Sequence, residues 1–545
     1  MTVTLRQAFA LSKDEVRDAT PFGTATLIEH EITRTITGHH DIDQAHLQLV
    51  PKPSADPADP LNWPMWRKIV VLLLMSVYSF LGNFASSVMS SALPTLITAF
   101  ADFHDGHGAP TGILTFSTVT HLLSVSLIMQ GLSNLWFVPL GNTFGRRPII
   151  LISLAILTGS SIWCAKATSF NSLLAARVFQ GVGEATSDTL APDCVGRLFF
   201  VHQRGRAMGV YTVFLAMGSL IGGLVGGYIT ADLGWRWTCW IPAILSGILL
   251  VLCTFLLPET MYDRETEDTL HHDHSSYLAD EKEGVTRSET VQSQDYPPFT
   301  FARSLKMGIY RPGLLRRLVT PFKTLRFPGT IMVMLHYGGL LALIVTISSV
   351  APLLLAEPPW LWGSNVGLIN VGGLIGAAIG AVYVHLTSDW WVKYKAKKEV
   401  HGYGEPEARL PLLFPGLIMA VAGALVFGFS ANGKAPKGWI GMEFGAGMIS
   451  FGLMQVPSIG FNYLIEAYGD WASDCFLMVI VTRSIISFAW TFFVGSWVES
   501  AGAALPFGIF TLFMALFSLT ALPVWLYGKR LRIFTEVWVR KEADW

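Results

Sequence analysis

Three ionisable side chains stand inside a long apolar region of the chain, in the stretch RVFQGVGEATSD. On a helical wheel, Arg177, Glu184 and Asp188 fall within about 40° of one another. An ionised side chain in the hydrocarbon of a membrane costs about 2.5 kcal/mol or more, so such residues face a partner or a watery cavity. The spacing therefore predicts one shared polar face on a helix.

The two acids of this face indicate proton or cation binding. Glu184 and Asp188 lie one helical turn apart, so each disfavours the other's charge and one of them gains affinity for a proton. Arg177, two turns away, either opposes that gain or binds an anion. A structural ion pair that only fixes this helix to a neighbour is the alternative. Asp193 falls on another side of the helix and is interpreted as an interface residue.

The composition predicts an integral membrane protein. Of the 545 residues, 51% are hydrophobic and 14% are charged, and the mean hydropathy is +0.46, above the range of soluble domains. The formal net charge of −1 gives no basic surface for nucleic acid, so that partner is not expected. The five cysteines lack the paired spacing of a zinc site or a disulfide framework and are interpreted as packing residues.

Apolar runs long enough to span a bilayer recur along the chain in two groups of six. We expect an all-α membrane protein with 12 transmembrane helices in two six-helix bundles. The predicted spans are 68–97, 113–140, 148–166, 172–196, 207–230 and 237–257, then 327–355, 363–387, 411–430, 438–467, 473–497 and 506–527.

Polar segments divide the chain around these spans. We expect a disordered cytosolic N-terminal tail (1–60), a first bundle (61–257), a cytosolic linker (258–325), a second bundle (326–528) and a cytosolic C-terminal tail (529–545). The linker contains HHDH at 271–274, which we interpret as part of a solvated loop and not as a metal site.

Basic residues in the short loops predict the orientation, because they favour the cytosolic side. The loops on the side of the amino terminus hold ten of them and the opposite loops hold four. Both termini are therefore expected in the cytosol. The ten are Arg146, Arg147, Arg197, Arg204, Arg206, Lys393, Lys395, Lys397, Lys398 and Arg409, and the four are Lys166, Arg236, Lys434 and Lys437.

Other polar residues within the predicted spans are candidates for a central cavity. Arg483 is the only basic residue of its apolar run, and Glu466 closes the preceding span, so we consider a pair between them. Each of the others is equally suited to packing, although His121 has a side chain that titrates near neutral pH. These others are Asn83, His121, His336, Asn462 and Tyr463.

The loop PLGNTFGRRP joins the second and third spans. Gly141 and Gly145 permit a tight turn, and Arg146 and Arg147 can hold a carboxylate or neighbouring helix ends. Simple anchoring at the cytosolic surface is the alternative. The loop resembles the corresponding motif of the major facilitator superfamily, with Asn142 where the family's acidic residue usually stands. Asp389, in LTSDWW, is expected in the equivalent loop of the second half, as an internal repeat predicts.

Two further stretches resemble the same superfamily in the expected order. Arg177, Gln180 and Gly181 match its fourth-helix motif. GSLIGGLVGG in the fifth span resembles the motif of twelve-span drug/proton antiporters through Gly218, Gly222, Gly226 and Gly227, with Gly223 in place of a proline. The same glycines would also serve close helix packing. The stretches PLNWPMWRK and LPETMYDR resemble the fungal branch that includes drug/proton antiporters and the histidinol and polyamine permeases.

The resemblance implies a secondary active transporter and no enzyme. It implies proton-coupled efflux of a drug, toxin or secondary metabolite by alternating access, or alternatively proton-coupled uptake of a cationic nutrient such as a polyamine. The expected partners are the small-molecule substrate, protons and the lipid bilayer of the plasma membrane, around a monomer with no cofactor or metal. The sequence has no nucleotide loop, metal-ligand spacing or nucleophile motif that indicates catalysis.

Overall fold

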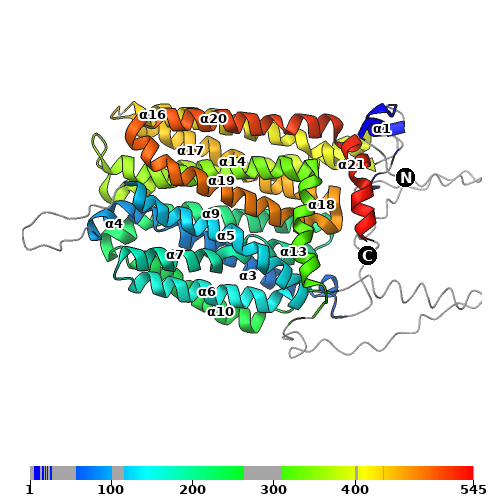
Figure 1. Cartoon of the computed structure of the whole chain (residues 1–545), viewed down its shortest axis with the longest axis horizontal. Coiled ribbons are helices and arrows are strands. Elements are labelled where there is room, and N and C mark those ends of the chain that lie inside the picture. The colour runs from blue at the N-terminus through cyan, green and yellow to red at the C-terminus, as the bar shows by residue number, and fades with distance from the viewer. Residues whose placement is uncertain are drawn as a thin grey trace, which may run out of the picture.

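The computed structural model describes residues 57–100, 116–262, 310–398, 403–433 and 435–543, together with Gly308 and short stretches within 5–26. Long helices run side by side along one direction (Figure 1). Helix α1 (Leu5–Ala10) and the last helix α21 (Ala521–Ala543) lie at the same end of this bundle, which we call the termini end; the opposite end is the far end. The HHDH stretch lies outside the described residues.

The first half of the bundle contains the helices from α3 to α10. Its first span is extended by the short helices η2 (Ser90–Ala92) and α4 (Leu93–Ala99), and its fourth span is broken into three pieces. The elements are α3 (Met65–Ser87), α5 (Phe116–Phe144), α6 (Arg146–Lys166), α7 (Phe170–Glu184), η3 (Ala185–Ser187), α8 (Leu190–Leu198), α9 (Val201–Leu233) and α10 (Trp237–Leu256).

The second half repeats this pattern from α14 to α21. Its fourth span is also interrupted, here by one π-helical turn, η7 (Val456–Gly460). The other elements are α14 (Pro328–Ala356), η5 (Gly363–Ile369), α15 (Asn370–Lys398), η6 (Pro406–Leu413), α16 (Phe414–Asn432), α17 (Gly438–Gln455), α18 (Phe461–Tyr468), η8 (Gly469–Trp471), α19 (Ala472–Ala501) and α20 (Ala504–Leu519).

Short elements also occur between and before the long helices. Strand β1 (Ala25–Thr26) pairs antiparallel with β2 (Tyr403–Gly404), and η1 (Pro60–Asn62) precedes α3. Helix α13 (Leu314–Lys323) and the turn η4 (Thr324–Arg326) lead into α14 and cross the long helices at the termini end (Figure 1).

Eleven helices of the described residues are long and apolar enough to cross a membrane. The fourth predicted span is not among them because it is short, polar and broken, yet its pieces run antiparallel along the whole of α6. Trp163 near the end of α6 donates a hydrogen bond to Ser172 at the start of α7 (3.1 Å), and Asp193 of α8 pairs with Arg146 at the start of α6. The chain thus crosses the bundle twelve times, as predicted.

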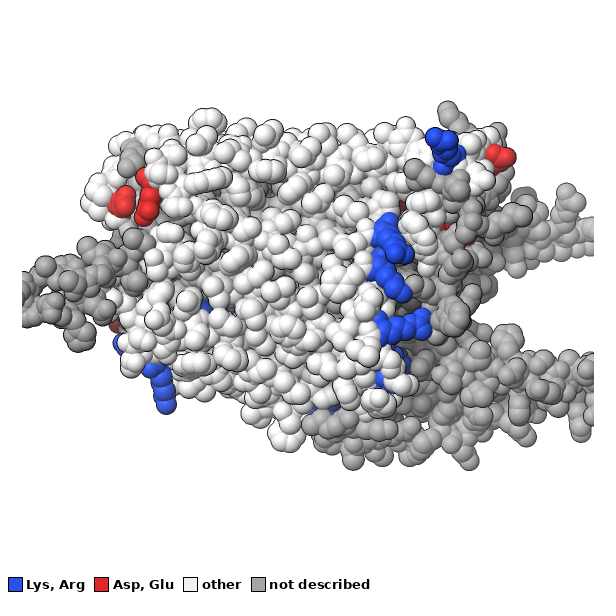
Figure 2. Space-filling model, viewed as in Figure 1, with Lys and Arg blue, Asp and Glu red and all other residues white. Residues whose placement is uncertain are grey.

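The surface matches a membrane-spanning bundle. In Figure 2 the broad middle of the visible face is almost entirely free of charged side chains, whereas Lys and Arg side chains gather at the termini end, over α13. Exposing so many aliphatic and aromatic side chains to water would be unfavourable, whereas the hydrocarbon of a bilayer solvates them. The molecule is a multi-pass membrane protein.

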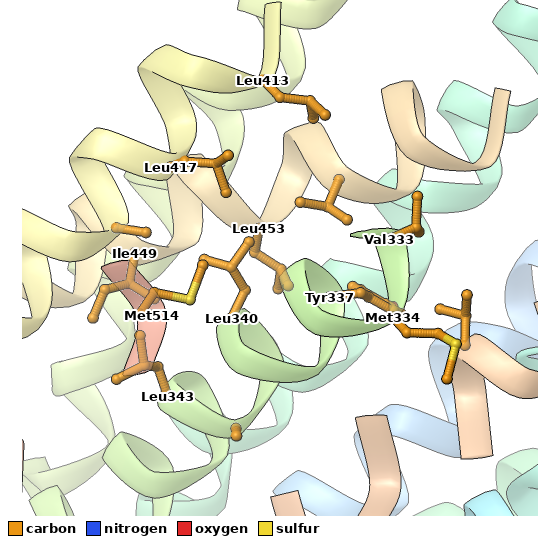
Figure 3. Packing of buried hydrophobic residues seen from close by; sticks show 14 of the residues in the cluster. Val333, Met334, Tyr337, Leu340, Leu343, Leu413, Leu417, Ile449, Leu453 and Met514 are labelled. Carbon is orange, nitrogen blue, oxygen red and sulfur yellow. The ribbon is translucent and has the colours of Figure 1, made fainter. Parts of the chain in front are cut away.

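Each half has its own apolar core, and α19 joins both. In the second half, side chains of α14, α16, α17 and α20 point toward one another, with Leu340, Ile449 and Met514 in contact at the centre (Figure 3). Leu477 and Val481 of α19 belong instead to the core of the first half. The halves therefore meet along α5 and α19 on one side and along α9 and α15 on the other.

Candidate functional site

The break in the fourth span places Asp188 at the interface between the halves. A proline ring clashes with the carbonyl of the residue four positions before it, so Pro192 prevents an α-helix from continuing through Asp188. Helix α7 ends at Glu184, the turn η3 follows, and α8 starts only at Leu190. The assumption of one regular helix from Arg177 to Asp188, and with it the shared polar face, is wrong for this reason.

Asp188 forms an ion pair with Arg483 of α19, which lies 295 positions later in the chain. The side chains of both residues are only 1% exposed. Asp188 also accepts hydrogen bonds from Gln130 Nε2 of α5 (2.9 Å) and, at longer range, from Asn83 Nδ2 of α3 (3.5 Å). One carboxylate thus connects spans one, two, four and eleven in a place closed to solvent.

Tyr337 of α14 completes the surroundings of Arg483. Its hydroxyl accepts a hydrogen bond from Arg483 Nη1 (3.2 Å), and the guanidinium lies 5.2 Å from the centre of its ring. The residue before Asp188 also binds a tyrosine, since the Tyr211 hydroxyl of α9 donates a hydrogen bond to the carbonyl oxygen of Ser187 (2.6 Å). Both halves therefore supply a buried tyrosine to the same site.

Arg177 lies apart from this pair. Its guanidinium donates to the carbonyl oxygens of Leu122, Ala85 and Ser86, each at 3.2 Å, and to the side chain of Gln180 at 2.8 Å. It therefore ties α7 to spans one and two and forms an ion pair with neither acid. The residues of the fourth-helix motif serve helix packing here, since Gly181 also lies against the backbone of Ser126.

Glu184 has the most unusual environment of the predicted residues. Its side chain is fully buried, and neither carboxylate oxygen has a hydrogen-bond partner among the described residues. Its aliphatic stem lies near Gly82 of α3, and the charges of Arg177 and Asp188 both act on it. Burial of a carboxyl group without a donor strongly penalises the ionised form, so this position is suited to holding a proton.

The second-half candidates are not brought to the site, apart from Arg483. Glu466 forms an ion pair with Arg409 (2.7 Å) at the termini end, so the predicted pair between Glu466 and Arg483 is wrong. Tyr463 lies in the core of the second half against Tyr468. Asn462 donates to the carbonyl of Ser458 within its own helix (2.6 Å).

The two predicted histidines lie elsewhere in the bundle. His121 stacks on Phe492 of α19 with ring centres 4.5 Å apart. His336 is buried against α20, where its Nε2 lies 2.9 Å from the carbonyl oxygen of Phe517. Both contacts are packing contacts between helices, and neither ring contacts Asp188 or Glu184.

Three residues of the site were missed in the sequence. Gln130, Tyr211 and Tyr337 are uncharged and stand in apolar runs like many packing residues, so only their three-dimensional position singles them out. The sequence does contain a signal for the break in the fourth span. Pro192 lies four residues after Asp188, and proline disfavours a continuous helix there. That signal would have corrected the helical wheel.

The glycine–arginine loop forms a second ionic site at the termini end. Gly145 has a φ of 99°, a conformation suited to glycine, and it turns the chain from α5 into α6. The buried Arg146 pairs with Asp193 of α8, confirming that Asp193 lies at a helix interface. The backbone N–H groups of Arg146 and Arg147 both donate to Glu259 (3.2 Å each), which caps α6.

The other two residues of the loop motif make packing and backbone contacts. Gly141 lies against the side chain of Leu190, and the carbonyl oxygen of Asn142 accepts a hydrogen bond from Arg317 of α13.

Asp389 lies within the continuous helix α15, so the expectation that it stands in a loop is wrong. Asn142 also lies within a helix, in the last turn of α5, and the correspondence between the two positions stays a prediction.

The second half has an equivalent ionic site at the termini end. The pair between Arg409, just before α16, and Glu466, at the end of α18, corresponds to the pair between Arg146 and Asp193. An arginine at the start of the third span and an acid at the end of the fourth thus recur in both halves.

The glycine run of α9 has two packing faces. A Cβ atom at Gly218, Gly222 or Gly226 would meet the backbone or Ser87 of the first span, so these glycines let α9 approach α3 closely. Gly223 and Gly227 face the second half instead, where Gly227 lies against the carbonyl of Ser364 and Gly223 against Asn370. The run therefore also forms the contact between the halves toward the far end.

This fold and interface define a membrane transporter built from two related halves. The chain belongs to the Major Facilitator Superfamily, whose family model matches residues 75–470. It is a secondary transporter and not an enzyme. No group of three or more His, Cys, Asp or Glu side chains that could hold a metal ion occurs among the described residues.

Comparison with known proteins gives fungal relatives over nearly the whole chain. Protein HOL1 of Saccharomyces cerevisiae is 25% identical, with 91% of this chain and 92% of that protein covered. Efflux pump radE of Floropilus chiversii is 24% identical, covering 88% and 83%. A structure of the xylose transporter XylE from E. coli, in a partially occluded inward open conformation, superposes with a TM-score of 0.57 at 15% identity, covering 85% of this chain and 98% of that one. The last likeness concerns the fold alone.

Proposed function

We propose that the protein exports a small organic molecule, such as a drug, toxin or secondary metabolite, in exchange for protons. Alternating access would rock the two halves about the interface that Asp188 and Arg483 span. The observation that carries the proposal is the contrast between two neighbouring buried acids. Glu184 has no hydrogen-bond donor among the described residues, whereas Asp188 has Arg483 of the other half as its ion-pair partner.

The proton would bind to Glu184. In the closed state the neutral acid avoids the cost of a buried, unpartnered charge. When the site opens to water on the low-proton side, the carboxyl group can release its proton and becomes an acceptor for a donor group of the substrate. Proton and substrate would then exclude each other at one place, which is the requirement for exchange.

Opening also requires that the halves separate around Asp188 and Arg483. Breaking a buried ion pair without replacement leaves two uncompensated charges. Water or a polar substrate group must therefore replace each partner when the site opens. The substrate would bind between Gln130, Tyr337 and this pair, with polar groups directed at them.

Uptake of a cationic nutrient such as a polyamine is the second candidate. The unpartnered carboxyl group of Glu184 favours it, since an ammonium group would supply the missing donors. Export is favoured by the name of the relative radE, an efflux pump. The proposed setting is a monomer in the plasma membrane with both termini in the cytosol, in line with the basic side chains at the termini end.

Direction can be tested in cells that lack the gene. Export predicts that such cells become hypersensitive to a toxic organic cation such as ethidium and accumulate it. Uptake predicts instead that they are protected from toxic concentrations of spermidine. Unchanged sensitivity and unchanged accumulation of both probes and of a panel of secreted metabolites would contradict export.

A further inference from the structure

Helix α13 presents an apolar face that no other described element covers. Leu315, Val319 and Phe322 are spaced so that they share one side of the helix, and they are 80%, 56% and 49% exposed. The surface continues onto Tyr310, which contacts the exposed Phe144 at the end of α5. An isolated apolar strip of this kind in water would be costly.

Basic residues flank this apolar strip. Arg316 follows Leu315 and is exposed, Lys323 follows Phe322, and Arg326 is exposed in the next turn. In Figure 2 this end of the molecule carries a row of Lys and Arg side chains, bordering the uncharged middle. Figure 1 shows α13 lying across the long helices and therefore along the plane of the membrane surface.

The opposite side of α13 is fixed to the bundle. Arg317 donates to the carbonyl of Asn142, and the backbone N–H of Arg311 donates to the carbonyl of Thr143 (2.8 Å). The helix also packs against α19 of the second half. It thus bridges the two halves at the termini end while its outer face looks toward the edge of the membrane.

We propose that α13 is an interfacial helix that binds anionic lipid headgroups at the termini end. The apolar strip would enter the boundary between headgroups and acyl chains, and Arg316, Lys323 and Arg326 would contact the anionic groups. The occupant is a lipid surface because the exposed strip lies at the border of the uncharged middle of the molecule and its flanks are basic. This inference goes beyond the proposed transport and is independent of substrate and direction.

The test uses the full chain with one fluorescent label. A Leu315→Cys variant is labelled with a polarity-sensitive dye and reconstituted in phosphatidylcholine vesicles with or without phosphatidylglycerol. An Ala435→Cys variant, in an exposed loop at the far end, is the control, and the unmodified chain gives the labelling blank because its five cysteines are buried. Quenching by doxyl-labelled lipid and by aqueous iodide is then compared.

We expect doxyl lipid to quench the label at position 315 roughly twofold more than the label at 435, with iodide showing the reverse order. Phosphatidylglycerol should strengthen doxyl quenching at 315. Replacing both Arg316 and Arg326 with Gln should remove that strengthening, whereas Arg236→Gln at the far end should not. Equal iodide quenching at both positions, protection from both quenchers, or no effect of lipid charge would each overturn the proposal.

Discussion

Asp188 and Arg483 form a buried ion pair between the fourth span of one half and the eleventh span of the other. Gln130 and Tyr337 bind the two partners from opposite halves. The pair is a buried polar contact across the interface between the two halves. Any motion that separates the halves at this site must therefore break it, and closure must form it again.

The ion pair should show strong energetic coupling. Asp188→Asn or Arg483→Gln alone should each destabilise the folded protein by about 3–5 kcal/mol, because the remaining charge stays buried without its partner. The double variant should lose much less than the sum of the two. Thermal unfolding midpoints in detergent measure this, and additive losses would contradict the pairing.

Glu184→Gln should separate proton coupling from folding. The amide is close in size but cannot release a proton, so we expect substrate flux to lose its response to a pH gradient while the amount of folded protein is kept. Glu443→Gln is the matched control, because Glu443 is a partly buried glutamate that accepts a hydrogen bond from Gly372 N (2.6 Å) outside the site. Equal loss of folded protein and transport in Glu184→Gln would favour a purely structural role.

The two ionic pairs at the termini end should differ in strength. Asp193→Asn leaves the buried Arg146 with one fewer acid and should cost about 3 kcal/mol. Glu466→Gln breaks a pair whose side chains are 17% and 30% exposed, and it should cost about 1 kcal/mol or less, decreasing with salt. Equal destabilisation, measured from unfolding midpoints at low and high salt, would refute this ranking.

The glycines of α9 should respond to substitution according to what they face. Gly226→Ala would drive a methyl group into the carbonyl of Val88, so the helices must separate, at a cost of about 1–3 kcal/mol. Gly209→Ala, in the same helix with nothing within 4 Å of the added carbon, should be neutral or stabilising by up to about 1 kcal/mol. Expression level and unfolding midpoint of the two variants test this, and a Gly226→Ala protein as stable as Gly209→Ala would contradict close packing on α3.

Eleven of the spans were predictable because hydrophobicity over some twenty residues depends on the bilayer and not on neighbouring helices. The broken fourth span is the exception, because its pieces are not long and apolar enough to stand out in this way. The pairings were not predictable in the same way. Glu466 pairs with Arg409 and not with Arg483, since the partner of a charge depends on helix placement. Arg177 illustrates the same limit: its partners are backbone carbonyls, and backbone groups leave no trace in a sequence pattern.

The prediction of one polar face from Arg177 to Asp188 is wrong for a local reason. A helical wheel assumes one continuous helix, whereas Pro192 and the residues Thr186 to Thr189 favour a break. As a result Asp188 turns to the other half, and Glu184 stays buried near α3. The two acids were correctly singled out, but their division into a paired and an unpaired carboxyl group required the structure.

The most direct test of the central claim measures coupled flux in vesicles. The purified protein is reconstituted with a pH-sensitive dye inside, a pH gradient is imposed with the membrane potential clamped at zero, and movement of ethidium and spermidine is recorded. The account predicts that the gradient drives the transported probe and that the probe moves protons in return, with both effects lost in Glu184→Gln. Flux that follows an imposed membrane potential but ignores the pH gradient would contradict it.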